Sequence, residues 1–120
     1  MARIILADDD AATLDLVRRA LELDGHTVTT ADDGTDAAAK IAGGGAFDVI
    51  VTDIQMPGMD GISLAKSVLA ANPRLKVVLI SAHAEVLDQA RNLDPVAVRL
   101  LAKPFTIEQV RGIVRAALGN

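Results

Sequence analysis

Five polar side chains in this sequence of 120 residues have the types and positions needed to handle a phosphoryl group. Each stands at the end of a short apolar run. Asp8 and Asp9 follow the first run, Asp53 the third, Ser81 the fourth and Lys103 the fifth. A carboxylate in such a position costs free energy, because it is partly desolvated and is repelled by any neighbouring acid. Taken alone, Asp53 fits two roles equally well: a group held by loop N–H donors, or a group that does chemistry.

Brought together, these side chains would form a site for phosphoryl transfer. Three neighbouring carboxylates repel one another, and a hard divalent cation relieves that repulsion. Because all the ligands are oxygen atoms, with no His or Cys among them, Mg²⁺ fits best. Asp53 can then attack phosphorus as a nucleophile and form an acyl phosphate. Lys103 would neutralise charge on the phosphoryl oxygens, and the Ser81 hydroxyl would donate a hydrogen bond to them.

The apolar runs before these residues are predicted strands, and the amphipathic segments between them are predicted helices. Strands are expected at residues 3–7 and 27–31, over the run through Val49 that ends at Asp53, and at residues 76–80 and 96–102. The strand at 27–31 is expected to be the most exposed. Helices are expected around 14–21, from Gly34 to the glycines at 43–45, from Asp60 to Asn72-Pro73, over 84–93, and from a Thr106/Gln109 capping box through Leu118.

The alternation of strands and helices determines where the polar residues lie. Strands that alternate with helices at this spacing form right-handed βαβ units, so we expect an α/β fold with a doubly wound parallel sheet and helices on both faces. In a parallel sheet the carboxyl ends of the strands share one edge, where ligands bind. Four of the five predicted strands therefore bring a polar side chain to the same edge.

Composition limits the function classes that remain. The length suits one domain, residues 1–120, and 51% hydrophobic residues argue against disorder. No apolar run approaches the roughly 20 residues of a membrane span, and no signal peptide is visible. With no cysteine, a net charge of −4, no Lys/Arg cluster and no Trp or Tyr, we expect a cytoplasmic protein without a membrane or a direct nucleic-acid partner.

Several motifs resemble the receiver domain of bacterial two-component response regulators. They are the Asp8-Asp9 pair after the first strand, TDIQMPGMDG around Asp53, LISAH after the fourth strand and LLAKPF after the fifth. Each motif is weak alone, but the combination covers essentially the whole chain and is highly specific. The resemblance implies a flavodoxin-like sheet with strand order 2-1-3-4-5.

The resemblance also implies a role for each residue of the site. Asp53 would accept phosphate from a sensor histidine kinase or a histidine phosphotransfer protein, in a Mg²⁺-dependent reaction. The further roles implied are the acidic pair for Asp8 and Asp9, a backbone-carbonyl metal ligand for Gln55, the switch hydroxyl for Ser81, the phosphoryl-pairing lysine for Lys103, and a cis Lys103–Pro104 bond. Such a domain catalyses only its own phosphorylation and dephosphorylation, so we expect no enzyme acting on other molecules.

The sequence departs from the family pattern in two places. Leu100 stands three residues before Lys103, where family members usually carry Tyr or Phe, and a leucine presents a smaller face with no hydroxyl. The Gly-Ala that commonly precedes the fifth strand is missing, and Asn92-Leu93-Asp94-Pro95 stands in its place. Because no output domain is visible, we expect a stand-alone receiver that binds its target through the fourth helix, fifth strand and fifth helix, on a reshaped surface, or that passes phosphate along a relay.

Two other functions are compatible with parts of this pattern. A Mg²⁺-dependent phosphohydrolase uses the same nucleophile, but enzymes of that kind with an Asp nucleophile commonly place an acid/base Asp where this chain has Gln55. A flavin-binding module would need hydroxyl and N–H groups after the first strand, where Asp8 and Asp9 would repel the flavin phosphate.

Other candidate residues have simpler interpretations. Asp10 and Asp60 are predicted helix N-caps, and the glycines at 43–45 are a helix stop, since they follow a helix and lack a Gly-Lys-Ser/Thr ending. His26 is predicted to be a surface residue. His83 lies beside the proposed site, where either a solvated loop residue or a modulator of acyl-phosphate hydrolysis is compatible with its position.

Overall fold

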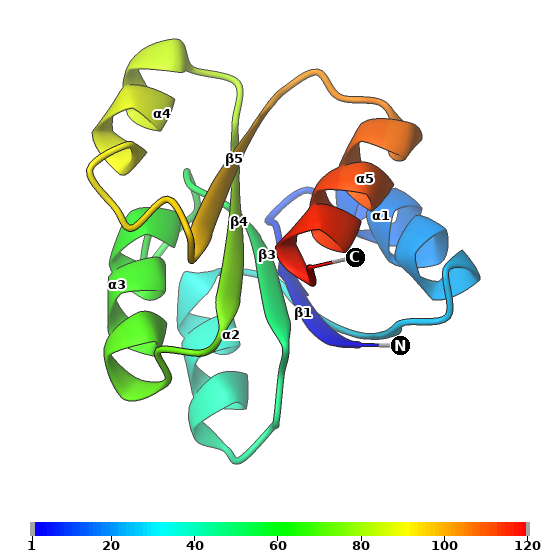
Figure 1. Cartoon of the computed structure of the whole chain (residues 1–120), viewed down its shortest axis with the longest axis horizontal. Coiled ribbons are helices and arrows are strands. Elements are labelled where there is room, and N and C mark those ends of the chain that lie inside the picture. The colour runs from blue at the N-terminus through cyan, green and yellow to red at the C-terminus, as the bar shows by residue number, and fades with distance from the viewer. Residues whose placement is uncertain (1, 120) are drawn as a thin grey trace.

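The computed structural model describes residues 2–119 as five strands and five helices in strict alternation (Figure 1). The strands are Arg3–Ala7 (β1), Thr27–Ala31 (β2), Val49–Asp53 (β3), Lys76–Ser81 (β4) and Val98–Ala102 (β5). The helices are Ala11–Leu23 (α1), Gly34–Ala42 (α2), Gly61–Ala71 (α3), Ala84–Ala90 (α4) and Ile107–Ala117 (α5).

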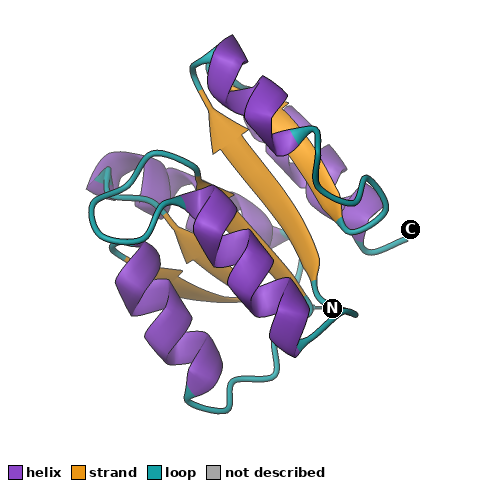
Figure 2. Cartoon of the chain, turned by 90° about the vertical axis from the view of Figure 1, so that its left-hand side faces the viewer, coloured by secondary structure: helices purple, strands orange, loops and turns teal. Residues whose placement is uncertain are grey.

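All five strands pair in parallel, in the order β2-β1-β3-β4-β5. This is the order that the resemblance implies, so the predicted doubly wound, flavodoxin-like fold is confirmed. The twisted sheet is visible between the helices in Figure 2. β2 lies at one edge and is only partly buried, as its alternating Thr-rich sequence predicts.

Two hydrophobic layers enclose the sheet. Alternate strand residues point to opposite faces, so Ile4 and Val49 pack toward α1 and α5, whereas their neighbours Ile5 and Ile50 pack toward α2, α3 and α4. Figure 1 shows the same division, with α1 and α5 on one side of the sheet and the other three helices opposite. Every residue of β3 is buried, and this central strand carries Asp53 to the edge of the sheet.

Side-chain caps place the first turns of the helices. Asp10, Asp60 and Thr106 each accept a backbone N–H bond in the first turn of α1, α3 and α5, which confirms the predicted caps. Gln109 returns the bond to Thr106 and completes the predicted capping box. Gly43 is the C-cap of α2, so the glycine run does end that helix.

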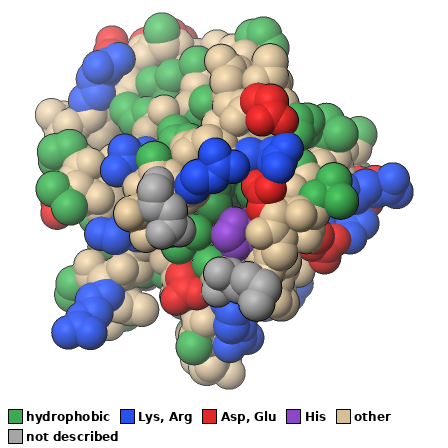
Figure 3. Space-filling model, turned by 45° about the vertical axis from the view of Figure 1, so that its right-hand side comes forward, with side chains coloured by type: hydrophobic (Ala, Val, Ile, Leu, Met, Phe, Trp, Pro, Cys, Tyr) green, Lys and Arg blue, Asp and Glu red, His purple; other side chains and the backbone are tan. Residues whose placement is uncertain are grey.

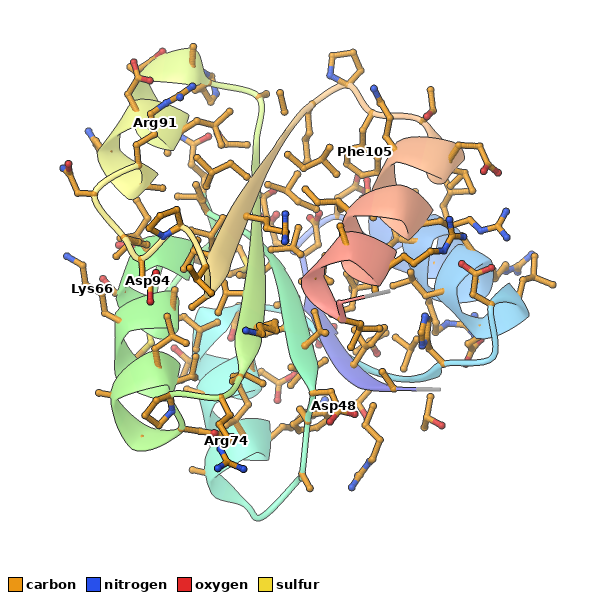
Figure 4. All side chains as sticks on the ribbon, viewed as in Figure 1. Asp48, Lys66, Arg74, Arg91, Asp94 and Phe105 are labelled. Atoms are coloured by element: carbon orange, nitrogen blue, oxygen red, sulfur yellow. The ribbon has the colours of Figure 1, made fainter. Side chains whose placement is uncertain are left out.

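The segment between α4 and β5 differs from the prediction. The helix ends at Ala90 instead of continuing to residue 93, and the strand begins at Val98 instead of 96. Asp94 accounts for the late start of the strand: its side chain accepts the N–H of Val96 at 2.9 Å and its carbonyl accepts the N–H of Val98 at 2.9 Å. This turn, around the labelled Asp94 in Figure 4, occupies residues that the apolar pattern assigns to the strand.

His26 also differs from the prediction of a surface residue. It is half-buried, and its Nδ1 atom accepts the backbone N–H of Ala2 at 3.1 Å. The contact joins the start of β1 to the start of β2, which lie side by side in the sheet. Within residues 2–119, every helix is too short or too polar to serve as a membrane span.

Candidate functional site at the carboxyl edge of the sheet

The structure brings the predicted site residues together at the carboxyl edge of the sheet. Asp8, Asp53 and Ser81 are buried there, Asp9 is exposed, and Lys103 is partly exposed. Figure 4 gives the orientation: Phe105, which follows Lys103 and Pro104, lies near this edge, whereas Asp48 and Arg74 lie at the opposite one. The convergence follows from the parallel topology, since each side chain ends or follows a strand.

Three carboxylates and one ammonium form the centre of the site. Asp8, Asp9 and Asp53 each offer an oxygen atom within 4.8 Å of the other two. The Lys103 Nζ atom donates to Asp53 Oδ2 at 2.8 Å and lies 3.6 Å from Asp8 Oδ2. One positive charge therefore faces three negative charges, and the site retains excess negative charge.

Burial and the neighbouring charges together perturb the pKa values of two of the groups. Burial is the main cause that raises the pKa of Asp8. The charges of Asp53 and Asp9 raise it further, while the Asp10 N–H and Lys103 act against them. Burial alone would lower the pKa of Lys103, but its hydrogen bond to Asp53 and its attraction to Asp8 and Asp53 outweigh that effect and raise the pKa. Lys103 is thus held in its charged form.

Backbone N–H groups orient the polar side chains. Asp10 N–H donates to Asp8 Oδ1 at 2.9 Å, and Gln55 N–H donates to Asp53 Oδ1 at 3.2 Å. The Ser81 hydroxyl oxygen accepts the His83 N–H at 3.0 Å. The sequence does not reveal these donors, because every residue except proline has an N–H and only the fold shows which one faces a polar side chain.

The remaining predicted residues lie beside this centre. Gln55 is exposed on the loop after β3 and lines an open groove between that loop and α4. Its backbone carbonyl is the group implied as a metal ligand. His83 is exposed and is the N-cap residue of α4, without a side-chain cap bond. The Lys103–Pro104 peptide bond is cis, as predicted.

The donor set fits a hard divalent cation. Three carboxylate oxygens converge, two from the residues that follow β1 and one from the end of β3. One of the acids is exposed, which leaves access for water ligands. The charge of a divalent cation would also relieve the repulsion that Lys103 leaves uncompensated. A donor set made only of oxygen atoms favours Mg²⁺ over metals that prefer sulfur or imidazole ligands.

Comparisons with known proteins agree with this geometry. Residues 4–115 match the family model described as the response regulator receiver domain. Response regulator MprA of Mycobacterium ulcerans is 34% identical over 116 residues, which make up 97% of this chain and 50% of that protein. The chain thus spans about half the length of the curated relatives it matches.

Solved structures show the same similarity. A response regulator receiver protein from Sinorhizobium medicae superposes with a TM-score of 0.89 and 34% identity, covering 98% of this chain and 94% of that one. TrrA from Thermotoga maritima, solved in complex with Mg²⁺–BeF, superposes with a TM-score of 0.85 and 26% identity, covering 98% and 100% of the two chains. The fold, the acidic edge and the family match lead to one conclusion: this chain belongs to the response regulator receiver domain family.

Proposed function

We propose that this chain accepts a phosphoryl group on Asp53 from a histidine kinase or a histidine phosphotransfer protein, in a Mg²⁺-dependent reaction. It would then signal by phosphorylation-dependent protein binding or pass the phosphoryl group along a relay in the cytoplasm. The observation that carries this proposal is the Lys103 ammonium, 2.8 Å from Asp53 and 3.6 Å from Asp8, at an acidic cluster that Asp9 completes. A nucleophile, a compensating cation and an acidic metal pocket are the parts that phosphoryl transfer requires.

The site residues have two kinds of role in this proposal: binding the metal and pairing with the phosphoryl group. The carboxylates of Asp8, Asp9 and Asp53 and the backbone carbonyl of Gln55 would hold Mg²⁺. When bound, the metal supplies positive charge next to the oxygens of the transferred group. Lys103, already held in its charged form, would pair with a phosphoryl oxygen after transfer.

The chemical step is a displacement at phosphorus. A carboxylate oxygen of Asp53 forms the new O–P bond while the N–P bond to the donor imidazole breaks, and the imidazole leaves with the bonding electron pair. The Ser81 hydroxyl would rotate to donate to a phosphoryl oxygen. Attack of water on phosphorus later breaks the O–P bond to Asp53, releases inorganic phosphate and restores the carboxylate. The domain would thus act on itself and not on a separate substrate.

The proposed output surface consists of α4, β5 and α5. Leu100 on β5 is half-buried against the layer formed with α3 and α4. We propose that its change of rotamer replaces the aromatic movement usual in the family. The Asp94 turn delays the start of β5 on this surface, which supports a partner contact of altered shape.

Phosphorylation with a small donor tests the proposal without the cognate kinase. Wild-type protein incubated with radiolabelled acetyl phosphate and Mg²⁺ should become labelled, and chelation of Mg²⁺ should prevent labelling. Asp53→Asn should remain unlabelled, whereas the control Asp88→Asn, an exposed carboxylate on α4, should be labelled like the wild type. Equal labelling of wild type and Asp53→Asn would overturn the assignment. Steady turnover of an external phosphoester by the wild type, lost in Asp53→Asn, would instead favour a phosphohydrolase that uses the same nucleophile.

A further inference from the structure

The loop after the phosphoacceptor, residues 54–60, contacts the first turn of α2 through backbone atoms. Gly34 is buried in that turn, and a Cβ atom placed on it would fall 1.8 Å from the carbonyl oxygen of Met59 and 2.8 Å from its carbonyl carbon. No real Cβ atom approaches backbone that closely, because the van der Waals repulsion is prohibitive. The backbones of the loop and of the helix can therefore lie this close together only because residue 34 is glycine.

A second contact joins the same two segments. Gly58 has a φ angle of 79°, in the left-handed region, and a Cβ atom placed on it would fall 2.6 Å from the Thr35 hydroxyl oxygen. Thr35 follows Gly34 in α2, and Gly58 precedes Met59 in the loop. The pairs Gly34–Met59 and Thr35–Gly58 thus form one interface. In each pair, the glycine leaves the space that a Cβ atom would fill.

The helix is the more firmly held partner of this interface. Asp33 caps α2 by accepting the N–H of Asp36 at 2.8 Å, and Ala37 is fully buried in the core one turn later. The middle of the loop has exposed residues at Gln55 and Pro57. A clash between the two segments would therefore displace the loop and not the helix.

The other end of the loop is joined to the site. Ile54 N–H donates to the Ile80 carbonyl on β4 at 2.9 Å, and Gly61 N–H closes the loop on the Ile54 carbonyl at 2.7 Å. Gln55 N–H donates to Asp53 Oδ1 at 3.2 Å. Only three residues separate Gln55 from Met59. A shift of the Met59 backbone would therefore also move the backbone of Gln55.

We propose that Gly34 is a positioning residue for the phosphorylation site. By allowing α2 to support the loop at Met59, it sets the position of the Gln55 carbonyl relative to Asp53. This proposal rests on the function proposed above, in which Gln55 is a Mg²⁺ ligand. Mg²⁺ requires near-octahedral ligand geometry, so its affinity responds to small displacements of one ligand.

The main test compares Gly34→Ala with two controls by isothermal titration with Mg²⁺. We expect Gly34→Ala to bind Mg²⁺ about tenfold more weakly, as expected for a ligand displaced by a fraction of an ångström. Gly112→Ala in α5 is the matched glycine control, since a Cβ there meets nothing within 4 Å, and it should bind like the wild type. Val114→Ala, buried on the opposite face of the sheet, should destabilise the fold without weakening Mg²⁺ binding.

Amide hydrogen exchange in metal-free protein provides a second readout. The amides of Gln55 and Gly61 should exchange faster in Gly34→Ala than in Val114→Ala, once the rates are corrected for global stability. Wild-type Mg²⁺ affinity in folded Gly34→Ala, or an equal loss in Val114→Ala, would overturn the proposal. If wild-type protein itself neither binds Mg²⁺ nor accepts phosphate, the proposed function fails, and amide exchange alone still decides whether Gly34 positions the loop.

A milder pair of variants covers the case in which Gly34→Ala does not fold. Gly58→Ala should weaken Mg²⁺ binding about fivefold, through the strain of a side chain at this positive φ angle and through the contact with Thr35. Adding Thr35→Ala should restore the part that the contact causes, because residues in contact show measurable coupling. Thr35→Ala removes the hydroxyl oxygen that meets the new Cβ and leaves the Thr35 Cβ at 3.7 Å. Absence of any restoration in the double variant would contradict a role for the contact with α2.

Discussion

Lys103 places its ammonium 2.8 Å from Asp53 and 3.6 Å from Asp8, so one cation from the end of β5 serves two buried carboxylates from β1 and β3. Asp9 adds a third acidic group to the same cluster. Without a metal, the charges are balanced only in part. Fold stability and metal binding should therefore respond to the same residues.

Removing the charge of Asp8 should stabilise the metal-free protein. The pKa of Asp8 is raised, chiefly by burial, so its ionised form costs free energy in the folded state. Asn at this position removes that cost and can still accept the Asp10 N–H. We expect Asp8→Asn to melt about 3 °C higher than wild type in EDTA, which is somewhat under 1 kcal/mol for a domain of this size. A lower melting temperature, with an unchanged circular dichroism spectrum, would contradict a crowded acidic pocket.

Mg²⁺ should raise the melting temperature of the wild type, because it binds the folded state preferentially. At a concentration 100 times the dissociation constant, the expected stabilisation is about 2.7 kcal/mol. Asp8→Asn and Asp9→Asn should lose most of this gain in differential scanning fluorimetry. Asp88→Asn, which also replaces an acid by an amide but lies on α4 outside the cluster, should retain it. If Asp88→Asn loses as much, the ion acts as general screening and not at the site.

Arg111 should contribute to stability through its contact with Asp24. Its guanidinium donates from Nε at 2.9 Å and from a second nitrogen to the two carboxylate oxygens, joining α5 to the end of α1 across 87 residues. Basic and acidic side chains lie next to one another on this side of the molecule (Figure 3). The pair raises the pKa of Arg111 and lowers that of Asp24, mainly through the side-chain hydrogen bond.

We expect Arg111→Met to lower the melting temperature more than Arg115→Met, which changes an exposed arginine of the same helix. The stabilisation from Asp24 should be present above its usual pKa of 3.8 and be lost as the pH falls below it. The difference between the two variants should shrink in about 1 M salt, where exposed charges are screened. Equal melting temperatures at low salt would show that the contact adds nothing to stability.

His26 should make the fold sensitive to mild acid. Burial is the main cause that lowers its pKa below the usual 6.5, and its Nδ1 must be unprotonated to accept the Ala2 N–H. The unfolded state therefore takes up the proton first as the pH falls. The stabilisation is complete above pH 6.5 and is lost as the pH falls through the lowered pKa of the folded state.

Urea unfolding at about pH 7.5 and about pH 5.5 measures this effect, because the usual histidine pKa lies between these values. The loss of stability between the two conditions should be smaller in His26→Gln than in the wild type. His83→Gln changes an exposed histidine beside the site and should behave like the wild type. The same pH dependence in all three proteins would exclude His26 as the responsible group.

The residue types and their order were enough to predict the α/β fold and to name the candidate site residues that the structure brings to one edge. Apolar runs of strand length, each ending in Asp, Ser or Lys, predict a parallel sheet, and parallel strands bring those ends to one edge. The caps at Asp10, Asp60 and Thr106 were also readable, because capping depends on residues only three or four positions apart.

The tertiary structure alone decided which distant groups touch. The Met59 carbonyl against Gly34, Arg111 on Asp24 and His26 on Ala2 join segments that no local pattern connects. The Asp94 turn shows most clearly where prediction from the sequence fails. The apolar pattern predicts a strand from residue 96, but hydrogen bonds to Asp94 hold residues 96 and 97 in a turn. Local sequence encodes periodicity and turns, whereas contacts between elements depend on how whole helices pack against the sheet, and that packing is a property of the complete chain.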